Sequence, residues 1–122
     1  MSQDLKDKAL AFVRHFQNSE WQEALEMCSD DATVWHNDGQ GEASIQDNVK
    51  GQAVKMEAVQ SMRYDIVRQL SEREEVMQQH VVNATLKNGA IFRLEVAAYF
   101  RFENGLITRI EEYSTEPSID AG

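Results

Sequence analysis

The chain has 122 residues, of which 42% are apolar and 27% charged, and this size and composition fit one globular domain with its own core. Its formal net charge is −9, and its 12 Lys and Arg residues form no cluster. Nucleic acid and anionic membranes are therefore not expected as partners, because both are bound mainly through positive charge.

The N-terminal segment is predicted to be helical. Apolar residues recur at intervals of three and four over 3–17, as in an amphipathic helix. Ser19 and Gln22 fit a capping box that starts a second helix, with Trp21 and Cys28 on its apolar side. Cys28 is the only cysteine, which excludes an internal disulfide, and its neighbours predict a buried thiol. The first residues lack the pattern of a signal peptide, so we expect a cytoplasmic protein.

A short strand and a third helix follow. Residues 32–36, Ala-Thr-Val-Trp-His, form a predicted strand, and the polar residues 37–50 predict an irregular loop at the rim of a site. A helix is predicted over about 51–62, with Val54 and Met62 on its apolar face. The first half of the chain is therefore mainly helical.

The second half changes to the period of two that is typical of strands. Strands are predicted at 64–70, 76–86, 91–102 and 106–115, with a charged turn at 71–75 and Asn-Gly turns at 88–89 and 104–105. Helices followed by a run of hairpin-linked strands predict an α+β fold with an antiparallel sheet.

The strand at 91–102 indicates which face of this sheet is buried. Its inward residues are predicted to be Phe92, Leu94, Val96, Ala98, Phe100 and Phe102. Ala98 is small among large neighbours, which leaves space for a pocket under the helices. The opposite face has apolar residues at Tyr99, Ile107 and Tyr113, and such a face predicts a homodimer.

Three segments of the chain, "SDDATVWHNDG", "NVKGQAVKM" and "AYFRFENGLITRIEEYS", resemble SnoaL-like proteins. These belong to the nuclear transport factor 2 superfamily, together with ketosteroid isomerases and limonene epoxide hydrolases. The resemblance covers about residues 5–115, so residues 1–122 are interpreted as one SnoaL-like domain with a C-terminal tail at 116–122. It implies a cone, in which a curved antiparallel sheet wraps around three N-terminal helices and encloses a pocket, and it implies a homodimer.

The resemblance to ketosteroid isomerases is tested residue by residue. Their catalytic Asp at the end of the first strand corresponds to His36 here. Their two oxyanion donors correspond to Phe12 and Ala98, and neither side chain can donate a hydrogen bond. Steroid isomerisation by that mechanism is therefore not expected.

The Asp-Arg-Asp group of limonene epoxide hydrolases is not matched either. The corresponding positions are His80, Val82 and Glu112, so a hydrolase of this type is a disfavoured alternative. The single acid of SnoaL-type cyclases, on the last strand, also falls on Glu112.

His36, Glu112 and His80 are the candidate catalytic residues. A His can take a proton from the carbon next to a carbonyl. Glu112 could be protonated and donate to the enolate oxygen, or be ionised and orient a His through its ring N–H. His36 could instead be only a rim residue, and the inward direction of His80 is implied by the resemblance alone. Two His and a Glu are also a possible metal-ligand set, but they share no short motif, and we expect no metal and no cofactor.

Strand alternation predicts that Val34 and His36 face the inside of the cone and that Trp35 faces away. The predicted pocket wall consists of Phe12, Phe16, Val34, Val82, Val96, Ala98 and Phe100. The leading hypothesis is an enzyme that acts on a small, apolar carbonyl compound by proton transfer, as an isomerase, aldol-type cyclase or lyase. The alternative is a non-catalytic module that binds a small apolar ligand, with no nucleic acid or membrane partner.

Overall fold

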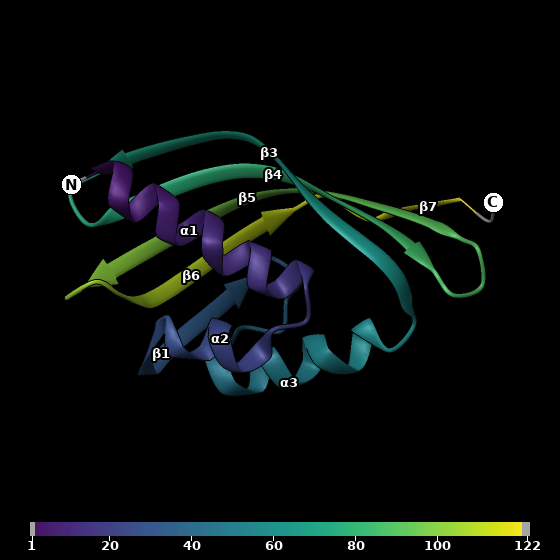
Figure 1. Ribbon diagram of the computed structural model, residues 1–122, viewed down its shortest axis with the longest axis horizontal. Coiled ribbons are helices and arrows are strands. Elements are labelled where there is room, and N and C mark those ends of the chain that lie inside the picture. Colours follow the sequence, from purple (N-terminus) through teal and green to yellow (C-terminus); the bar gives the residue numbers. More distant parts are fainter. Residues whose placement is uncertain (1, 121–122) are drawn as a thin grey trace.

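A computed structural model describes residues 2–120 of the chain. Helices and strands follow in the order α1 (Ser2–Gln17), α2 (Trp21–Glu26), β1 (Cys28–His36), β2 (Glu42–Ser44), α3 (Ile45–Met56), β3 (Val59–Glu72), β4 (Glu75–Leu86), β5 (Ile91–Glu103), β6 (Leu106–Ser114) and β7 (Ser118–Asp120). The long strands form a curved sheet, and the helices cover one face of it (Figure 1). The predicted α+β cone is confirmed.

The strands form one sheet in the order β2-β1-β6-β5-β4-β3, and β7 pairs with β5. Strands β3 to β6 are joined by antiparallel pairing, as predicted, but β1 pairs with β6 in parallel. The sheet is therefore mixed rather than wholly antiparallel. After β1 the chain passes through four strands, β2 to β5, before β6 pairs with β1 in the same direction. This parallel pair brings the ends of β1 and β6 together.

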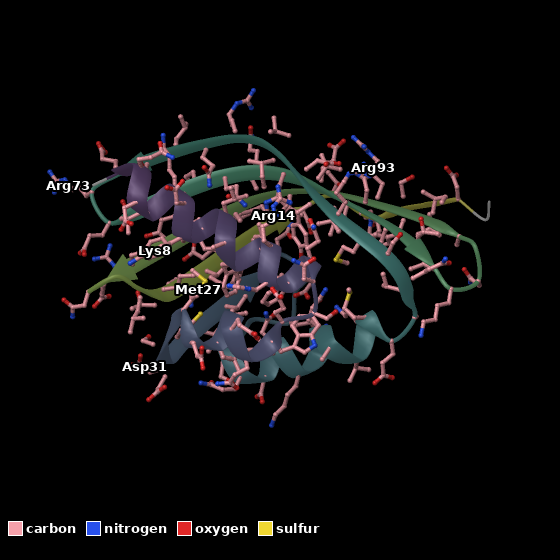
Figure 2. All side chains as sticks on the ribbon, in the orientation of Figure 1. Lys8, Arg14, Met27, Asp31, Arg73 and Arg93 are labelled. Carbon is pink, nitrogen blue, oxygen red and sulfur yellow. The ribbon has the colours of Figure 1, made fainter. Side chains whose placement is uncertain are left out.

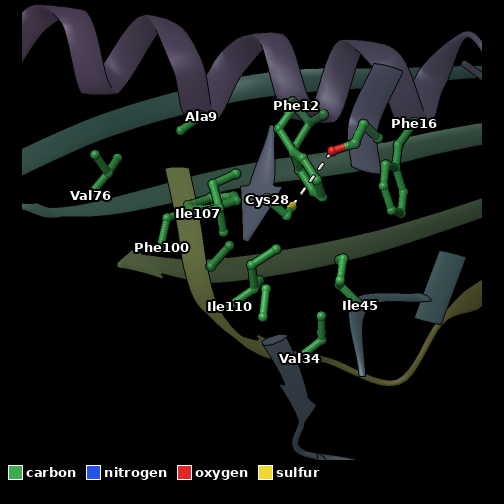
Figure 3. Close-up of a cluster of buried hydrophobic side chains, with 14 of the residues drawn as sticks. Ala9, Phe12, Phe16, Cys28, Val34, Ile45, Val76, Phe100, Ile107 and Ile110 are labelled. Carbon is green, nitrogen blue, oxygen red and sulfur yellow. Dashed lines mark hydrogen bonds between the residues drawn. The ribbon is translucent and has the colours of Figure 1, made fainter. Parts of the chain in front are cut away.

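Helix α1 packs its apolar side against the sheet. It contacts β3 and β4, and its Phe12 ring lies 4.8 Å from Phe16 and 6.1 Å from Phe100 between ring centroids. Figure 3 shows these side chains in one cluster with residues of β1 and β6. The inward residues predicted for β5 are confirmed, because Ala98, Phe100 and Phe102 are buried and the others pack against the same core.

Helix α1 is held to the sheet at two points by the side chains of Lys8 and Arg14 (Figure 2). The Lys8 ammonium donates to the carbonyl of Gly105, and the Arg14 guanidinium donates to the carbonyl of Tyr64. Helix α1 is therefore fixed to both sides of the cone.

Helix α2 begins differently from the prediction. Its N-cap is Glu20, with no side-chain cap hydrogen bond, so the capping box of Ser19 and Gln22 is wrong. Ser19 has a φ of 57° and its N–H bonds to the carbonyl of Phe16, so it closes α1 instead. Cys28 begins β1, and burial raises the pKa of its thiol to about 12.

Two further boundaries also differ from the prediction. The loop predicted over 37–50 contains β2 and the start of α3, which begins six residues earlier than expected. Its buried residues are Ile45 and Val49, while Val54 is 64% exposed. The segment predicted as a tail, 116–122, contains β7.

Ile107 lies on the inner face, against the prediction that it belongs to the outer one. Phe102 pairs with Ile107, whereas Arg101 pairs with Arg109, so Thr108 is an extra residue in β6. This bulge shifts the alternation by one, and Ile107 is fully buried. None of the helices between residues 2 and 120 combines the length and apolar character needed to cross a membrane.

Candidate functional site

His36 and Glu112 meet where β1 and β6 end side by side. They are register partners in the parallel pair, and His36 Nε2 lies 2.7 Å from Glu112 Oε1. Trp35 points to the opposite face, where its ring centroid lies 5.0 Å from that of Tyr113. Val34 is buried in the core on the side of His36. The alternation predicted for this strand is confirmed.

The hydrogen bond to Glu112 dominates the electrostatics of His36. It raises the pKa of His36 above the usual 6.5, while burial of the ring opposes this rise. The charges of Glu112 and Asp38 raise the pKa further, and the charge of Lys55 lowers it. His36 therefore holds its proton to a higher pH than a free His, while the Glu112 carboxylate is hydrogen-bonded to one of its ring nitrogens.

A cavity of about 220 Å³ lies beside His36, between β1, the following turn and α3. Its lining consists of Val34, His36, Asp38, Gln40, Gly41, Glu42, Ala43, Asp47, Asn48, Gly51, Gln52 and Lys55. Asp38 shapes the turn by accepting a hydrogen bond from the N–H of Gln40 at 2.9 Å. Of the seven residues predicted to form the pocket wall, Val34 lines this cavity and the other six lie in the buried core.

His80 lies on the inner face of β4, where it is 2% exposed. Gln78, on the same face and fully buried, donates from Nε2 to His80 Nδ1 at 3.0 Å. The Gln78 carbonyl oxygen accepts from Gln69 Nε2 at 2.7 Å, and Gln69 also donates to the carbonyl of Lys6. Burial lowers the pKa of His80, so the ring is neutral at neutral pH.

Tyr64 packs against His80 from β3, with 5.2 Å between ring centroids. Burial raises the pKa of its hydroxyl well above the usual range, so Tyr64 stays protonated. The charge of Glu112 raises the pKa values of Tyr64, His80 and His36 alike. One carboxylate therefore acts electrostatically on all three side chains.

Sequence reasoning missed Gln78 and left the face of Tyr64 open. Alternation from His80 would have placed Gln78 on the same face, but a Gln between Met77 and Gln79 carries no chemical signal of its own. Lys55 lies within the helix predicted over about 51–62, but it was missed because no local pattern shows that this helix forms a wall of the cavity beside β1. Among residues 2–120, no group of three or more His, Cys, Asp and Glu side chains is arranged to hold a metal ion.

The family model of the SnoaL-like domain matches residues 9–110. The chain belongs to the SnoaL-like domain family. No curated protein sequence matches it significantly.

Solved structures share the fold of this SnoaL-like chain at low identity. AusH from Aspergillus nidulans is 11% identical with a TM-score of 0.86, and the match covers 99% of this chain and 90% of AusH. AclR from Streptomyces galilaeus, a proposed hydroxylase, is 17% identical with a TM-score of 0.84 over 94% of this chain and 91% of AclR. An LEH-like epoxide hydrolase of M. tuberculosis is 16% identical with a TM-score of 0.77 over 93% and 84% of the two chains. These similarities establish the fold, whereas the activity has to be argued from the residues of the site.

In this SnoaL-like chain, the positions that resemble the oxyanion donors of ketosteroid isomerases are apolar and buried. Phe12 and Ala98 belong to the hydrophobic core. Val82, at the position that resembles an acid of limonene epoxide hydrolases, is buried too. The polar side chains that the structure places in or beside the core are others, among them His36, Glu112, His80, Gln78 and Tyr64.

Proposed function

We propose that this chain is an enzyme that moves a proton on a small-molecule carbonyl compound of largely apolar character, without a cofactor, as an isomerase, aldol-type cyclase or lyase. The observation that carries the proposal is the 2.7 Å contact between His36 Nε2 and Glu112 Oε1 at the edge of the apolar core. A His oriented by a carboxylate is a common arrangement for a general base.

The hydrogen bond assigns the roles of the two ring nitrogens. Neutral His36 donates its Nε2–H to the Glu112 carboxylate, which leaves the lone pair of Nδ1 to accept a proton. The proton leaves the carbon next to the carbonyl, its bonding electrons form an enolate, and the new imidazolium is stabilised by Glu112. Return of the proton to another carbon completes an isomerisation.

The cavity beside His36 supports a site for one end of the substrate. Its volume of about 220 Å³ is below the ~300–1,000 Å³ of pockets that enclose a whole drug-sized ligand. Val34 connects its wall to the buried core. The reacting carbon would lie in this cavity, and the apolar part of the substrate would extend toward the interior of the cone.

A second candidate function is a non-catalytic module that binds a small apolar ligand. The observation that favours it is the apolar, buried state of Phe12 and Ala98, since a known route to enolate stabilisation in this fold is missing there. Both candidates are compatible with a homodimer formed through the outer sheet face, which we also propose.

Deuterium exchange at the carbon next to the carbonyl tests the enzyme directly, because it reports proton transfer without knowledge of the product. A panel of cyclic ketones and lactones in D₂O is followed by NMR. We expect His36→Gln to slow exchange by about 10²-fold or more, the usual contribution of a general base. The free energy of unfolding should change by about 1 kcal/mol or less, since the ring lies at a partly exposed strand end.

His15→Gln is the matched control, because His15 also pairs with a carboxylate, that of Glu20 at 2.9 Å, but on α1. It should leave exchange unchanged. If the wild-type protein catalyses no exchange with ketones that native mass spectrometry shows to be bound, the binding module replaces the enzyme.

A further inference from the structure

A series of hydrogen-bonded amides on β3 and β4 ends on His80, on the inner face of β4. Lys6 supplies a backbone carbonyl, Gln69 donates to it and to Gln78, and Gln78 donates to His80 Nδ1. Each of these hydrogen bonds joins an amide N–H to an acceptor, so the direction of donation is fixed along the whole series. Because Nδ1 accepts the last hydrogen bond, the hydrogen of the neutral ring must be on Nε2.

The structure shows no hydrogen bond from the Nε2–H of His80 to the residues it describes, and Nε2 is not among the fully enclosed polar atoms without a partner. This N–H therefore borders open space, where water or a ligand can accept its hydrogen bond. The ring of Tyr64 packs against that of His80, and its hydroxyl likewise forms no hydrogen bond within residues 2–120 and is not fully enclosed. The two side chains thus place free donors inside the cone.

Ala98 leaves the space between Glu112 and the amide side chains free of a bulky group. Glu112, Ala98 and Gln78 are successive partners across β6, β5 and β4. The methyl group of Ala98 is the shortest side chain in this row, so no bulky group from β5 separates Glu112 from the amide chain. The effect of the Glu112 charge on His80 is consistent with this arrangement.

We propose that His80 is a catalytic residue that donates its Nε2–H to an oxygen of the substrate, and that Gln78 is the positioning residue that fixes this tautomer. The inference rests on the proposed function and supplies the donor that Phe12 and Ala98 cannot provide. A neutral imidazole stabilises a developing enolate through its hydrogen bond without giving up its proton.

The spacing of the two His residues restricts the substrate. Strands β1 and β4 are separated by β6 and β5, so the backbones of His36 and His80 are three strand spacings apart, ~14 Å on a flat sheet. The side chains and the curvature of the sheet shorten this distance. A substrate that meets both must therefore lie across β6 and β5, with its carbonyl oxygen toward His80 and the acidic carbon next to the carbonyl toward His36.

The tautomer is measured without any ligand, by long-range ¹H–¹⁵N NMR of the histidine rings at pH 7.5. We expect His80 to be neutral with its hydrogen on Nε2. In Gln78→Glu the carboxylate accepts a hydrogen bond instead of donating one, so Nδ1 should gain a proton. Gln79→Glu adds the same charge at the neighbouring exposed position and should leave the His80 signals unchanged. If Gln78→Glu does not fold, Gln78→Met removes the donor without adding charge and should loosen the preference for Nε2–H.

The donor is tested with 1-tetralone and with tetralin, which has the same carbon skeleton but no oxygen. We expect 1-tetralone, and not tetralin, to shift the Nε2 resonance of His80. His80→Phe should weaken the binding of 1-tetralone by about threefold to tenfold, as expected for one lost hydrogen bond, and leave tetralin unaffected.

A wild-type His80 that carries its hydrogen on Nδ1 overturns the proposal, and so does an Nε2 resonance that 1-tetralone does not move. These outcomes are separate from those of the proposed function. If His36→Gln loses exchange but 1-tetralone does not move the His80 resonance, the proposed proton transfer is supported and the His80 donor is not. If 1-tetralone moves the His80 resonance but His36→Gln exchanges normally, the His80 donor is supported and His36 is not the base.

Discussion

The proton on His36 is subject to two opposing influences. Its hydrogen bond to Glu112 favours the charged ring, and burial favours the neutral one. The hydrogen bond is the larger, so the pKa of His36 rises above 6.5. A raised pKa makes the ring a stronger base, but it also leaves a smaller neutral fraction at a given pH. The proposed proton transfer should therefore become faster as the pH increases through this pKa.

NMR titration of His36 in the wild-type protein and in Glu112→Gln tests this balance. We expect a pKa above 6.5 in the wild type and a lower pKa in the variant, because the main cause of the rise is removed. A raised folded-state pKa stabilises the protein below the unfolded pKa, and this contribution is lost as the pH rises through the folded value. Glu112→Gln should thus cost more stability at pH 6 than at pH 8.5. Equal pKa values in the two proteins would contradict the assigned cause.

At the scale of residues, the sequence was sufficient for part of the site. Alternation placed His36 inward, and the resemblance added Glu112. The amide chain was beyond reach, because the role of Gln78 depends on Gln69, which lies across a register set by a bulge between Ile66 and Arg68. A bulge changes which residues face each other without leaving a mark in the apolar pattern.

At the scale of elements, α3 positions Lys55 and Gln52 on the wall of the cavity. Its start depends on Ser44, whose Oγ accepts a hydrogen bond from the N–H of Asp47 at 3.1 Å. This Ser-x-x-Asp pattern is a helix start signal that the polar character of the surrounding segment obscured. The helix was therefore predicted too late, although its existence was predicted correctly.

Ser44→Ala should lower the free energy of unfolding by about 1 kcal/mol, the usual cost of losing an N-cap side chain. Chemical denaturation measures the change. Ser61→Ala is the control, since Ser61 is an exposed residue of β3 and should change stability by less than about 0.5 kcal/mol. An equal effect of both substitutions would show that the cap adds nothing.

The strands show what periodicity can and cannot predict. The inward row of β5 followed from simple alternation, because that row has no interruption. In β6 the extra residue at Thr108 placed both Ile107 and Ile110 on the inner face, a spacing of three that alternation does not allow. The parallel pairing of β1 with β6 was not predictable from local pattern either, since the partners are far apart in the sequence.

At the scale of the whole molecule, the outer face of the sheet carries exposed apolar side chains. Leu70, Met77 and Tyr99 form a row across β3, β4 and β5, and Leu70 is 65% exposed. Beside this row lies a groove of about 600 Å³ whose lining includes Val67 and Tyr113. An antiparallel sheet with a free outer face normally presents polar side chains there. Ile107, which was predicted on this face, lies on the inner face instead, but the outer face still has exposed apolar residues.

We expect two copies of the chain to bury this face against each other, with ~800 Å² covered on each copy as in a standard stable interface. Light scattering at micromolar concentration should give about twice the 13.9 kDa of one chain. Tyr113→Glu should shift the mass toward the monomer, because it places a charge in the apolar centre of the contact. Val54→Glu is the control, since Val54 is equally apolar and 64% exposed but lies on α3, and it should leave the mass unchanged. A wild-type mass near 13.9 kDa would rule out this interface and leave the exposed apolar row without a partner of its own kind.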